Sequence, residues 1–341
     1  MSTFVLHASF SRMNNTKTDF FATLQFRTEA YLTWRRRRLR IKREKQKAKN
    51  PIIDWLEAFI WAAGVVLLVN QYIFQAYQIP SGSMIDTLLI GDRIFVNKLV
   101  YGPELLPGIG KVPSPILPKR LQVVIFENPS YLSRGPVFDV AQRILYMLTL
   151  SLVDIDRDEN KQPRAHFLIK RAVGMPGDTL KTVRGDLYLR FPGESAWTSE
   201  TDYKSALGTQ YHVSRFMAAT EYPALLAAGR KDGFTDIGLT ASPGDSSTAA
   251  EAPAIRYPDY IAYEAARLEV LRSAFPQDKR YSEMLARHTQ GWYVPEGRLF
   301  PMGDNRDNSR DARYFGPVKF KNVLGQAMFI YWPMNRIGRI R

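Results

Sequence analysis

The stretch from Gln78 to Gly91 reads Q-I-P-S-G-S-M-I-D-T-L-L-I-G and directly follows an apolar segment. Pro80 cannot continue a helix and biases the residue before it toward extended geometry, while Gly82 permits a sharp bend between Ser81 and Ser83. Two hydroxyl groups on such a turn can act on one reacting carbonyl group. The alternative is a Ser/Gly turn that only ends the preceding helix, and the rest of the chain decides between the two.

The apolar segment before the turn is a candidate membrane helix. Residues 52–76 are mostly apolar, although the uninterrupted run, Ala58 to Val69, is shorter than the about 20 residues that cross a bilayer's hydrocarbon. Aromatic side chains near both ends can lie at interfacial depth and extend the span; they are Trp55, Trp61, Tyr72 and Tyr77. We predict one transmembrane helix within residues 51–78, and a buried core helix is the alternative.

A dense basic cluster precedes the candidate helix. Between Arg35 and Lys49, ten Lys and Arg residues are opposed only by Glu44, and they contribute most of the formal net charge of +14. Positive flanks of membrane helices stay cytoplasmic, so residues 1–50 are predicted to be a cytoplasmic basic tail that also contacts anionic phospholipid. Everything after the helix would then lie outside the cytoplasm, and we predict no nucleic-acid binding. For part of residues 1–34, a disordered tail and an overextended start of the chain both remain open.

The body of the chain has mainly strand-like patterns. Runs rich in β-branched and aromatic residues, bounded by Gly and Pro, predict strands at residues 92–98, 121–126, 166–173, 291–294 and 325–332. Residues 180–189 predict a hairpin around Arg184-Gly185-Asp186. Residues 202–288 instead have helical periods, clearest at 261–274, with a Ser/Ala/Gly/Pro-rich loop at 238–253. We predict a mainly β fold of antiparallel sheets, in two parts at 79–201 and 291–341, with a mostly helical insertion at 202–290.

A second apolar segment lies within an insertion at residues 130–160. Its apolar content is concentrated in residues 137–153, which are too few to span a membrane and are predicted to be helical. Packing in the core and lying in the membrane interface both remain open for this segment.

Several kinds of catalytic site are excluded by what the chain lacks. It has no cysteine, so it has no disulfide, no thiolate nucleophile and no cysteine metal site. It contains neither H-E-x-x-H nor G-x-S-x-G, and none of its four histidines is in a recognisable triad context: His7, His166, His212 and His288. We predict no metal and no cofactor. A nucleophilic serine in this chain would need a lysine as its base.

Lys170 has the surroundings that such a base requires. On a strand over residues 166–173 it shares a face with Leu168 and Ala172. The ordinary lysine pKa of about 10.4 must fall by roughly 3 to 4 units before the amine accepts a proton near neutrality. Desolvation on an apolar face lowers the pKa in this direction.

Four blocks of sequence carry a family resemblance. They are P-S-G-S-M at 80–84, I-G-D-R-I at 90–94, K-R-A-V-G-M-P-G-D at 170–178 and G-D-N-R-D-N-S-R-D-A-R at 303–313. In this order, after a membrane helix of the expected orientation, they resemble the boxes of the bacterial type I signal peptidases, also called leader peptidases. The resemblance covers the membrane helix and the β body, but not the N-terminal tail, the apolar segment near Ile144 or most of the helical insertion.

The resemblance implies roles for individual residues. Ser83 matches the nucleophile and Lys170 the general base. Ser81 matches the residue whose hydroxyl joins the Ser83 backbone N–H in the oxyanion hole. The supporting residues are Ser309, which matches the hydroxyl that orients the lysine amine, Arg171 with Asp304 as one ion pair, and Asp311 with Arg313 as a second.

The resemblance also implies a function. The expected protein is a monomeric, membrane-anchored serine endopeptidase that removes N-terminal signal peptides from exported preproteins, cutting after small residues in an A-x-A-like pattern. It would lie in the inner membrane as a single-pass protein, with its N-terminus in the cytoplasm and its catalytic body on the outer side. The alternatives are a specialised processing protease with the same chemistry and a catalytically silent, membrane-tethered binding relative.

Two positions depart from the family pattern. Many relatives carry proline three residues after the serine, where this chain has Asp86. A carboxylate close to Lys170 would favour its charged form and oppose catalysis, so Asp86 is expected to point away or to have its charge offset. Ala312 stands where serine is frequent, and that change is expected to be mild.

Overall fold

The computed structural model describes residues 4–47, 50–106, 109–159, 161, 164–209, 211–251 and 259–340. The chain divides into two compact units between Gly64 and Val65.

The first unit contains helix α1 (Phe4–Lys47) and most of helix α2 (Pro51–Tyr72). A disordered tail was one alternative for part of residues 1–34, but the described residues from Phe4 onward are helical. The physical reason is that neither Gly nor Pro occurs before Pro51, so nothing in the local sequence breaks the helix. Pro51 then starts α2, and the Asn50 side chain accepts a hydrogen bond from the Ile52 N–H at 3.0 Å.

Within the described part of the chain, α2 is the one helix that is long and apolar enough to cross a membrane. It is shorter than the predicted helical segment, because residues 74–78 form strand β1 (Phe74–Gln78) instead. The helix ends where Gln71 Nε2 donates to the Glu104 carbonyl at 2.9 Å, and the following residues pair with strand β2 (Arg93–Asn97). The local pattern could not reveal this pairing, since apolar residues occur on both sides of Tyr72.

The second unit is built on an eight-stranded sheet, which confirms the predicted mainly β, antiparallel fold. Its strand order is β1-β2-β13-β5-β6-β11-β12, with β14 beside β13, and every pairing in it is antiparallel. The further strands are β5 (Val123–Glu127), β6 (Phe167–Gly174), β11 (Arg298–Met302), β12 (Val318–Lys319), β13 (Val323–Trp332) and β14 (Gly338–Arg339). Residues far apart in the sequence therefore form one surface.

Two smaller sheets accompany the large one. One has the order β10-β7-β8-β9 and contains the predicted hairpin, and the other pairs β3 with β4. The strands are β3 (Glu104–Leu106), β4 (Ile109–Lys111), β7 (Thr179–Val183), β8 (Asp186–Arg190), β9 (Thr198–Ser199) and β10 (Trp292–Tyr293). Short 3-10 turns lie at η1 (Gly82–Met84), η2 (Leu99–Tyr101), η3 (Ala219–Glu221), η4 (Arg306–Asn308), η5 (Phe320–Asn322) and η6 (Met334–Arg336).

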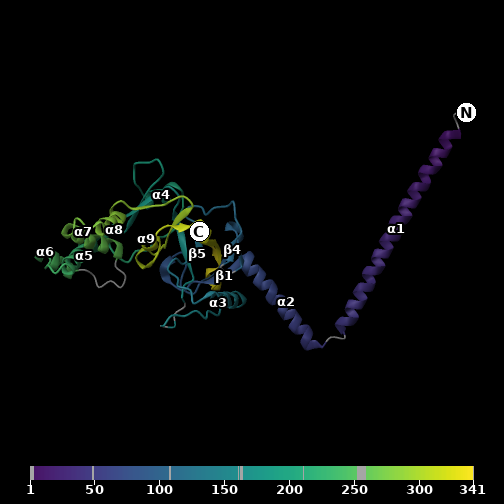
Figure 1. Ribbon diagram of the computed structural model, residues 1–341, viewed down its shortest axis with the longest axis horizontal. Helices are drawn as coiled ribbons and strands as arrows, with labels where there is room; N and C mark the ends of the chain where they lie inside the picture. The colour runs from purple at the N-terminus through teal and green to yellow at the C-terminus, as the bar shows by residue number, and fades with distance from the viewer. Residues whose placement is uncertain are drawn as a thin grey trace. The chain divides into compact units, whose positions relative to one another are not determined.

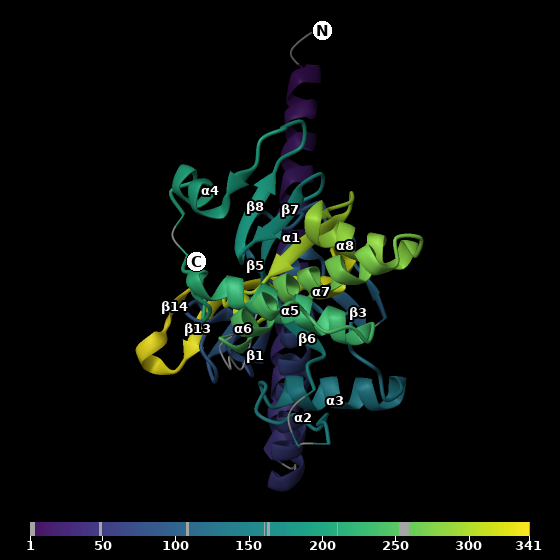
Figure 2. The same cartoon turned by 90° about the vertical axis from the view of Figure 1, so that its left-hand side faces the viewer.

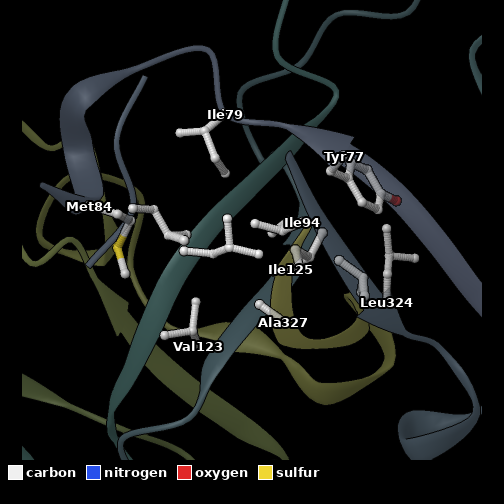
Figure 3. Packing of buried hydrophobic residues seen from close by; sticks show 11 residues of the cluster. Tyr77, Ile79, Met84, Ile94, Val123, Ile125, Leu324 and Ala327 are labelled. Carbon is white, nitrogen blue, oxygen red and sulfur yellow. The ribbon is translucent and has the colours of Figure 1, made fainter. Parts of the chain in front are cut away.

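A buried apolar cluster holds the start of the stretch from Gln78 to Gly91 against the large sheet. Figure 3 shows Ile94, Ile125 and Ala327 from three strands gathered with Ile79 and Met84. Residues 79–84, called here the serine turn, are therefore anchored at both ends by buried side chains. The turn is held by the core beneath it as well as by its Pro and Gly.

Helices supply the remainder of the second unit. They are α3 (Pro136–Leu148), α4 (Glu200–Ala206), α5 (Tyr222–Asp236), α6 (Pro243–Ala250), α7 (Tyr260–Ala274), α8 (Lys279–Thr289) and α9 (Ala312–Phe315). Figures 1 and 2 show α5 to α8 gathered into one group, with α3 standing apart from them. The predicted helical insertion is thus present, and so is the predicted helix in the second apolar segment.

One part of the insertion was predicted wrongly. Residues 238–253 were expected to be a loop, but α6 forms inside this range. Ser242 caps the helix by accepting a hydrogen bond from the Asp245 N–H, and Pro243 occupies its first turn. The Ser and Pro that suggested a loop are here the start signal of a helix. The last two residues of the predicted loop, 252 and 253, lie outside the described residues.

Candidate active site

The serine turn places Ser83 on a clamped and largely buried backbone. Ser83 lies in η1 and is 8% exposed. Asn305 holds the turn from across the fold: its side chain donates to the Gly82 carbonyl at 3.0 Å, and its backbone N–H donates to the Ser83 carbonyl at 3.1 Å. Asn305 belongs to residues 303–313, called here the box loop. The two sequence blocks therefore meet through backbone hydrogen bonds.

Lys170 lies in β6 and reaches Ser83 directly. Its Nζ is 2.6 Å from Ser83 Oγ and 3.1 Å from the Ile169 carbonyl oxygen, and the residue is 3% exposed. Burial lowers the pKa of Lys170 to about 8, and Arg313 acts in the same direction, while Asp311 and Asp304 act against the shift. A large share of this amine is therefore uncharged at mildly alkaline pH, and it faces a hydroxyl group.

The two predicted ion pairs both form, and both are buried. Arg171 and Asp304 are fully buried, and the guanidinium holds the carboxylate in two hydrogen bonds of 2.9 and 2.7 Å. Asp311 and Arg313 form a second paired fork, at 2.9 and 3.0 Å. Burying such a pair costs free energy, because each charge loses its hydration. Removing one partner leaves the other charge buried and unpaired. The first pair holds the box loop against β6, and the second lies within the box loop.

The Asp311 carboxylate has several partners. Burial raises the pKa of Asp311, but the Arg313 guanidinium, the Gly303 N–H and the Ser309 hydroxyl together hold that pKa below its usual range. The Gly303 N–H lies 3.0 Å from Asp311 Oδ2. The carboxylate is thereby kept charged in the wall of the site.

Ser309 and Ser81 differ in their relation to the dyad. Ser309 is buried beside Gly303, where a Cβ would lie 2.2 Å from Ser309 Oγ and 2.5 Å from the Ser83 carbonyl oxygen. Ser309 is not among the hydrogen-bond partners of Lys170 Nζ in the described part of the chain. Ser81 caps η1 with extended backbone and is exposed. It lines the same cavity as the dyad.

A cavity of about 420 Å³ opens from the dyad. Its lining includes Ser83, Lys170 and Ser81, together with Ile79. It also includes Tyr146 of α3 and residues of the segment that follows this helix. The second apolar segment therefore forms part of the wall of the candidate active site.

The model of the signal peptidase family, peptidase S26, matches residues 52–332. The chain belongs to this family. It is accordingly a serine endopeptidase.

Relatives with assigned names agree with the family match. Signal peptidase I of Haemophilus influenzae is 28% identical, with 86% of this chain and 74% of the relative covered. Signal peptidase I of Buchnera aphidicola is 25% identical, over 88% of this chain and 85% of the relative. Among solved structures, a signal peptidase I from Enterococcus faecalis is 20% identical, covers 61% of this chain and 95% of its own, and has a TM-score of 0.23. The relatives and the apolar α2 fit a membrane location for the peptidase.

Asp86, the departure from the family pattern, lies in an exposed pair. Its carboxylate is 3.3 Å from His212 Nε2, and both side chains are more than half exposed. It is not among the charged groups that shift the pKa of Lys170. The charge at this position is therefore directed to another partner and to solvent.

The residues that tie the helical insertion to the site of this peptidase were not predicted from the sequence. Glu200 of α4 pairs with Arg306 of the box loop at 2.6 Å, and Arg215 pairs with Asp307 at 2.9 Å. Tyr211 stacks over the Arg171 guanidinium at 4.1 Å. Arg306 and Asp307 stand inside a quoted block, but nothing in the sequence indicates that their partners come from residues 200–215.

Proposed function

We propose that this peptidase removes N-terminal signal peptides from exported preproteins, with Ser83 as nucleophile and Lys170 as general base. The observation that carries the proposal is the 2.6 Å contact between a buried lysine amine and a serine hydroxyl on the wall of a cavity. A lysine with a lowered pKa is a suitable base for serine, because it accepts a proton at the working pH.

The proposed reaction has two stages. Neutral Lys170 takes the proton of Ser83 Oγ as the oxygen attacks the scissile carbonyl carbon, and the resulting ammonium gives that proton to the leaving amine of the mature protein. The peptide C–N bond breaks, and an ester of Ser83 remains. Lys170 then takes a proton from water, the hydroxide attacks the ester, and Ser83 recovers its proton as the signal peptide leaves with a carboxyl end.

The negative oxygen of each tetrahedral intermediate needs preformed donors. The backbone N–H of Ser83 and the hydroxyl of Ser81 are the proposed pair. One such donor is typically worth about 10² to 10³ in rate. Ser81 is exposed at the mouth of the turn, where its hydroxyl is free to rotate toward a bound carbonyl.

Two unpaired strand edges support the binding of an extended peptide. β1 ends the order of the large sheet, so one of its sides has no neighbouring strand among those that the structure describes. β11 pairs with β6 only from Arg171 onward, which leaves Phe167 to Lys170 unpaired on the side away from β5. A substrate strand can add its backbone to such edges. The apolar lining beside Ser83, which includes Ile79 and Leu168, suits small side chains such as alanine.

We further propose that α2 anchors the peptidase in the inner membrane as a single-pass, monomeric protein. The basic run before α2 would stay in the cytoplasm beside anionic phospholipid, and the β body would lie on the outer side. Ten residues lie between Tyr72 and Ser83, and five of them form β1, so the cleft would lie near the bilayer. Signal peptides present their cleavage sites at this level.

The test is signal removal by the full-length chain in detergent or vesicles. A preprotein with an A-x-A site should be cut after the second alanine by the wild type and not by Ser83→Ala. Mass spectrometry of the mature N-terminus gives the cleavage position. Ser273→Ala, on the exposed face of α7, is the matched control and should retain full activity. A correctly folded wild type that cuts no preprotein would favour the silent binding relative.

Ser81→Ala tests the oxyanion hole separately. We expect kcat to fall by about 10²-fold with little change in KM, because the donor that is removed stabilises only the transition state. Unchanged turnover would remove Ser81 from the oxyanion hole.

A further inference from the structure

The open edge of β1 has no free backbone N–H between residues 76 and 80. The Ile79 N–H donates across to the Asp92 carbonyl at 2.9 Å, so in the alternating pattern of an antiparallel strand Ala76, Gln78 and Pro80 face the open side. Pro80 has no N–H to donate. The Ala76 N–H donates to Asn70 Oδ1 at 3.4 Å. The Gln78 N–H donates to the hydroxyl of Tyr146 at 3.3 Å.

Tyr146 comes from α3, which the family boxes do not include. Its ring centroid is 6.1 Å from that of Tyr77 in β1, and it lines the same cavity as Ser83 and Lys170. Burial raises the pKa of Tyr146 to about 12. The phenol is therefore neutral throughout the working pH range and accepts the Gln78 N–H as a hydroxyl.

The helix that carries Tyr146 is fixed across the cleft. Arg143, one turn earlier, pairs with Glu104 at 3.3 Å, and its guanidinium lies 5.0 Å from the Phe167 ring centroid of β6. Gln142 donates to Asp154 at 2.9 Å, so the segment after α3 is tied back to the helix. One helix thus contacts both strands that border the proposed substrate path, β1 through Tyr146 and β6 through Arg143.

We infer that Tyr146 is a specificity-determining residue that closes the substrate cleft upstream of the dyad. This inference rests on the proposed peptide-cleaving function. A substrate strand that pairs with Gln78 must displace the Tyr146 hydroxyl, and a bulky substrate side chain there must also displace the ring. Gln78 lies three positions before Ser81, the proposed oxyanion-hole donor, or about 10 Å along an extended chain. The affected substrate position therefore lies about four residues before the scissile bond.

The test compares substrates that differ only at the fourth residue before the scissile bond, Ala or Trp. The wild type should prefer the Ala substrate by about tenfold or more in kcat/KM, a discrimination that shape alone can supply. Tyr146→Ala should reduce this preference at least about fivefold, mainly through a lower KM for the Trp substrate. Tyr146→Phe keeps the ring but releases the Gln78 N–H, so it should keep the preference and lower KM for both substrates.

Tyr293→Ala, an exposed tyrosine in β10, is the matched control and should leave the preference unchanged. An unchanged preference in Tyr146→Ala would overturn the inference. If Tyr146→Ala does not fold, a Tyr146→Phe enzyme with wild-type KM values for both substrates would overturn it.

A binding measurement separates this inference from the proposed function. Fluorescent peptides with the same two sequences are bound to the Ser83→Ala chain, with and without Tyr146→Ala. A preference for Ala in binding that Tyr146→Ala weakens supports the inference even if the wild type cuts neither peptide. Equal affinities for both peptides in the two chains would overturn it whatever the cleavage result.

Discussion

Two buried lysines, one in the large sheet and one at the end of one of its strands, have similarly lowered pKa values but different neighbours. Lys170 in β6 is 3% exposed and Lys98, just after β2, is 2% exposed. Burial is the first cause of a lowered pKa in both, and it brings each pKa to about 8. Lys170 Nζ faces Ser83 Oγ at 2.6 Å, whereas Lys98 Nζ faces the side-chain oxygen of Gln75 at 3.1 Å. The lowered pKa is common to both, and only the neighbour distinguishes a candidate base from a structural amine.

A perturbed pKa is therefore not by itself a sign of catalysis. An amide oxygen has no proton to give, so Lys98 has nothing to deprotonate. The cavity is the second distinction. Lys170 lines it with Ser83, and Lys98 does not line it. A base requires a reacting partner and access for the substrate, and these are geometric conditions.

The largest expected effect separates the two lysines by mutation. Lys170→Met should lower kcat/KM by roughly 10⁴-fold or more, because the nucleophile loses its base. Lys98→Met makes the same substitution at an equally buried lysine, and its kcat/KM should stay within about threefold of the wild type. Preprotein cleavage under the same conditions measures both. Comparable losses in the two variants would break the comparison.

The effect of Lys98→Met should be seen instead in how the free energy of unfolding depends on pH. The folded-state pKa of Lys98 is about 8, below the ordinary lysine value of 10.5, so the unfolded chain binds the proton first as the pH falls. The unfolding free energy therefore rises between pH 8 and 10.5, by roughly 3 kcal/mol for one such lysine. Lys98→Met should remove that share of the rise in urea unfolding, and an unaltered pH slope would contradict the low pKa.

The next effect concerns the buried pair that supports the Lys170 site. Arg171→Met leaves the Asp304 carboxylate buried without its guanidinium, and it should destabilise the fold by about 3 to 5 kcal/mol. Arg171→Lys keeps the charge but cannot form the two-point contact, so its loss should be smaller. Thermal unfolding of the two variants gives this order. Equal stability of Arg171→Met and the wild type would show that the pair is not needed.

A smaller effect sharpens the account of the Lys170 pKa. The base must be neutral, so kcat/KM should rise with pH through an apparent pKa of about 8 and level off above it. The Asp311 charge favours the ammonium form, and Asp311→Asn should move the rising limb to lower pH, by up to about one unit. A pH–rate profile measures the shift. Movement to higher pH would contradict the proposed environment of Lys170.

The smallest effect is expected at Asp86. This carboxylate is exposed and pairs with His212, so solvent and salt screen its field. Asp86→Asn should change kcat/KM by less than about twofold and leave the pH profile in place. A clear shift of the limb would show that Asp86 reaches Lys170 electrostatically after all.

The two residues of the proposed dyad could be picked out from short patterns. Ser83 stands on a Pro/Gly turn, and Lys170 stands among apolar neighbours on a strand, which are both local properties of the sequence. The end of α2 was harder to predict from the sequence. Residues 74–78 continue the apolar composition of the helix, and only their pairing with β2 makes them a strand. The loop predicted at 238–253 failed in a similar way, since Ser242 and Pro243 start a helix as readily as they start a turn.

The residue types that are available can be recognised from local sequence: a serine on a tight turn, a lysine on an apolar strand face, a box loop rich in charged residues and one apolar helix. These follow from local propensity and from burial preferences that can be read along the chain. The packing of the folded chain determines that Lys170 faces Ser83 while the equally buried Lys98 faces Gln75. It also determines that Tyr146 covers the Gln78 N–H, 68 residues away in the sequence. Such contacts depend on how strands and helices pack, and packing is fixed by the whole chain at once.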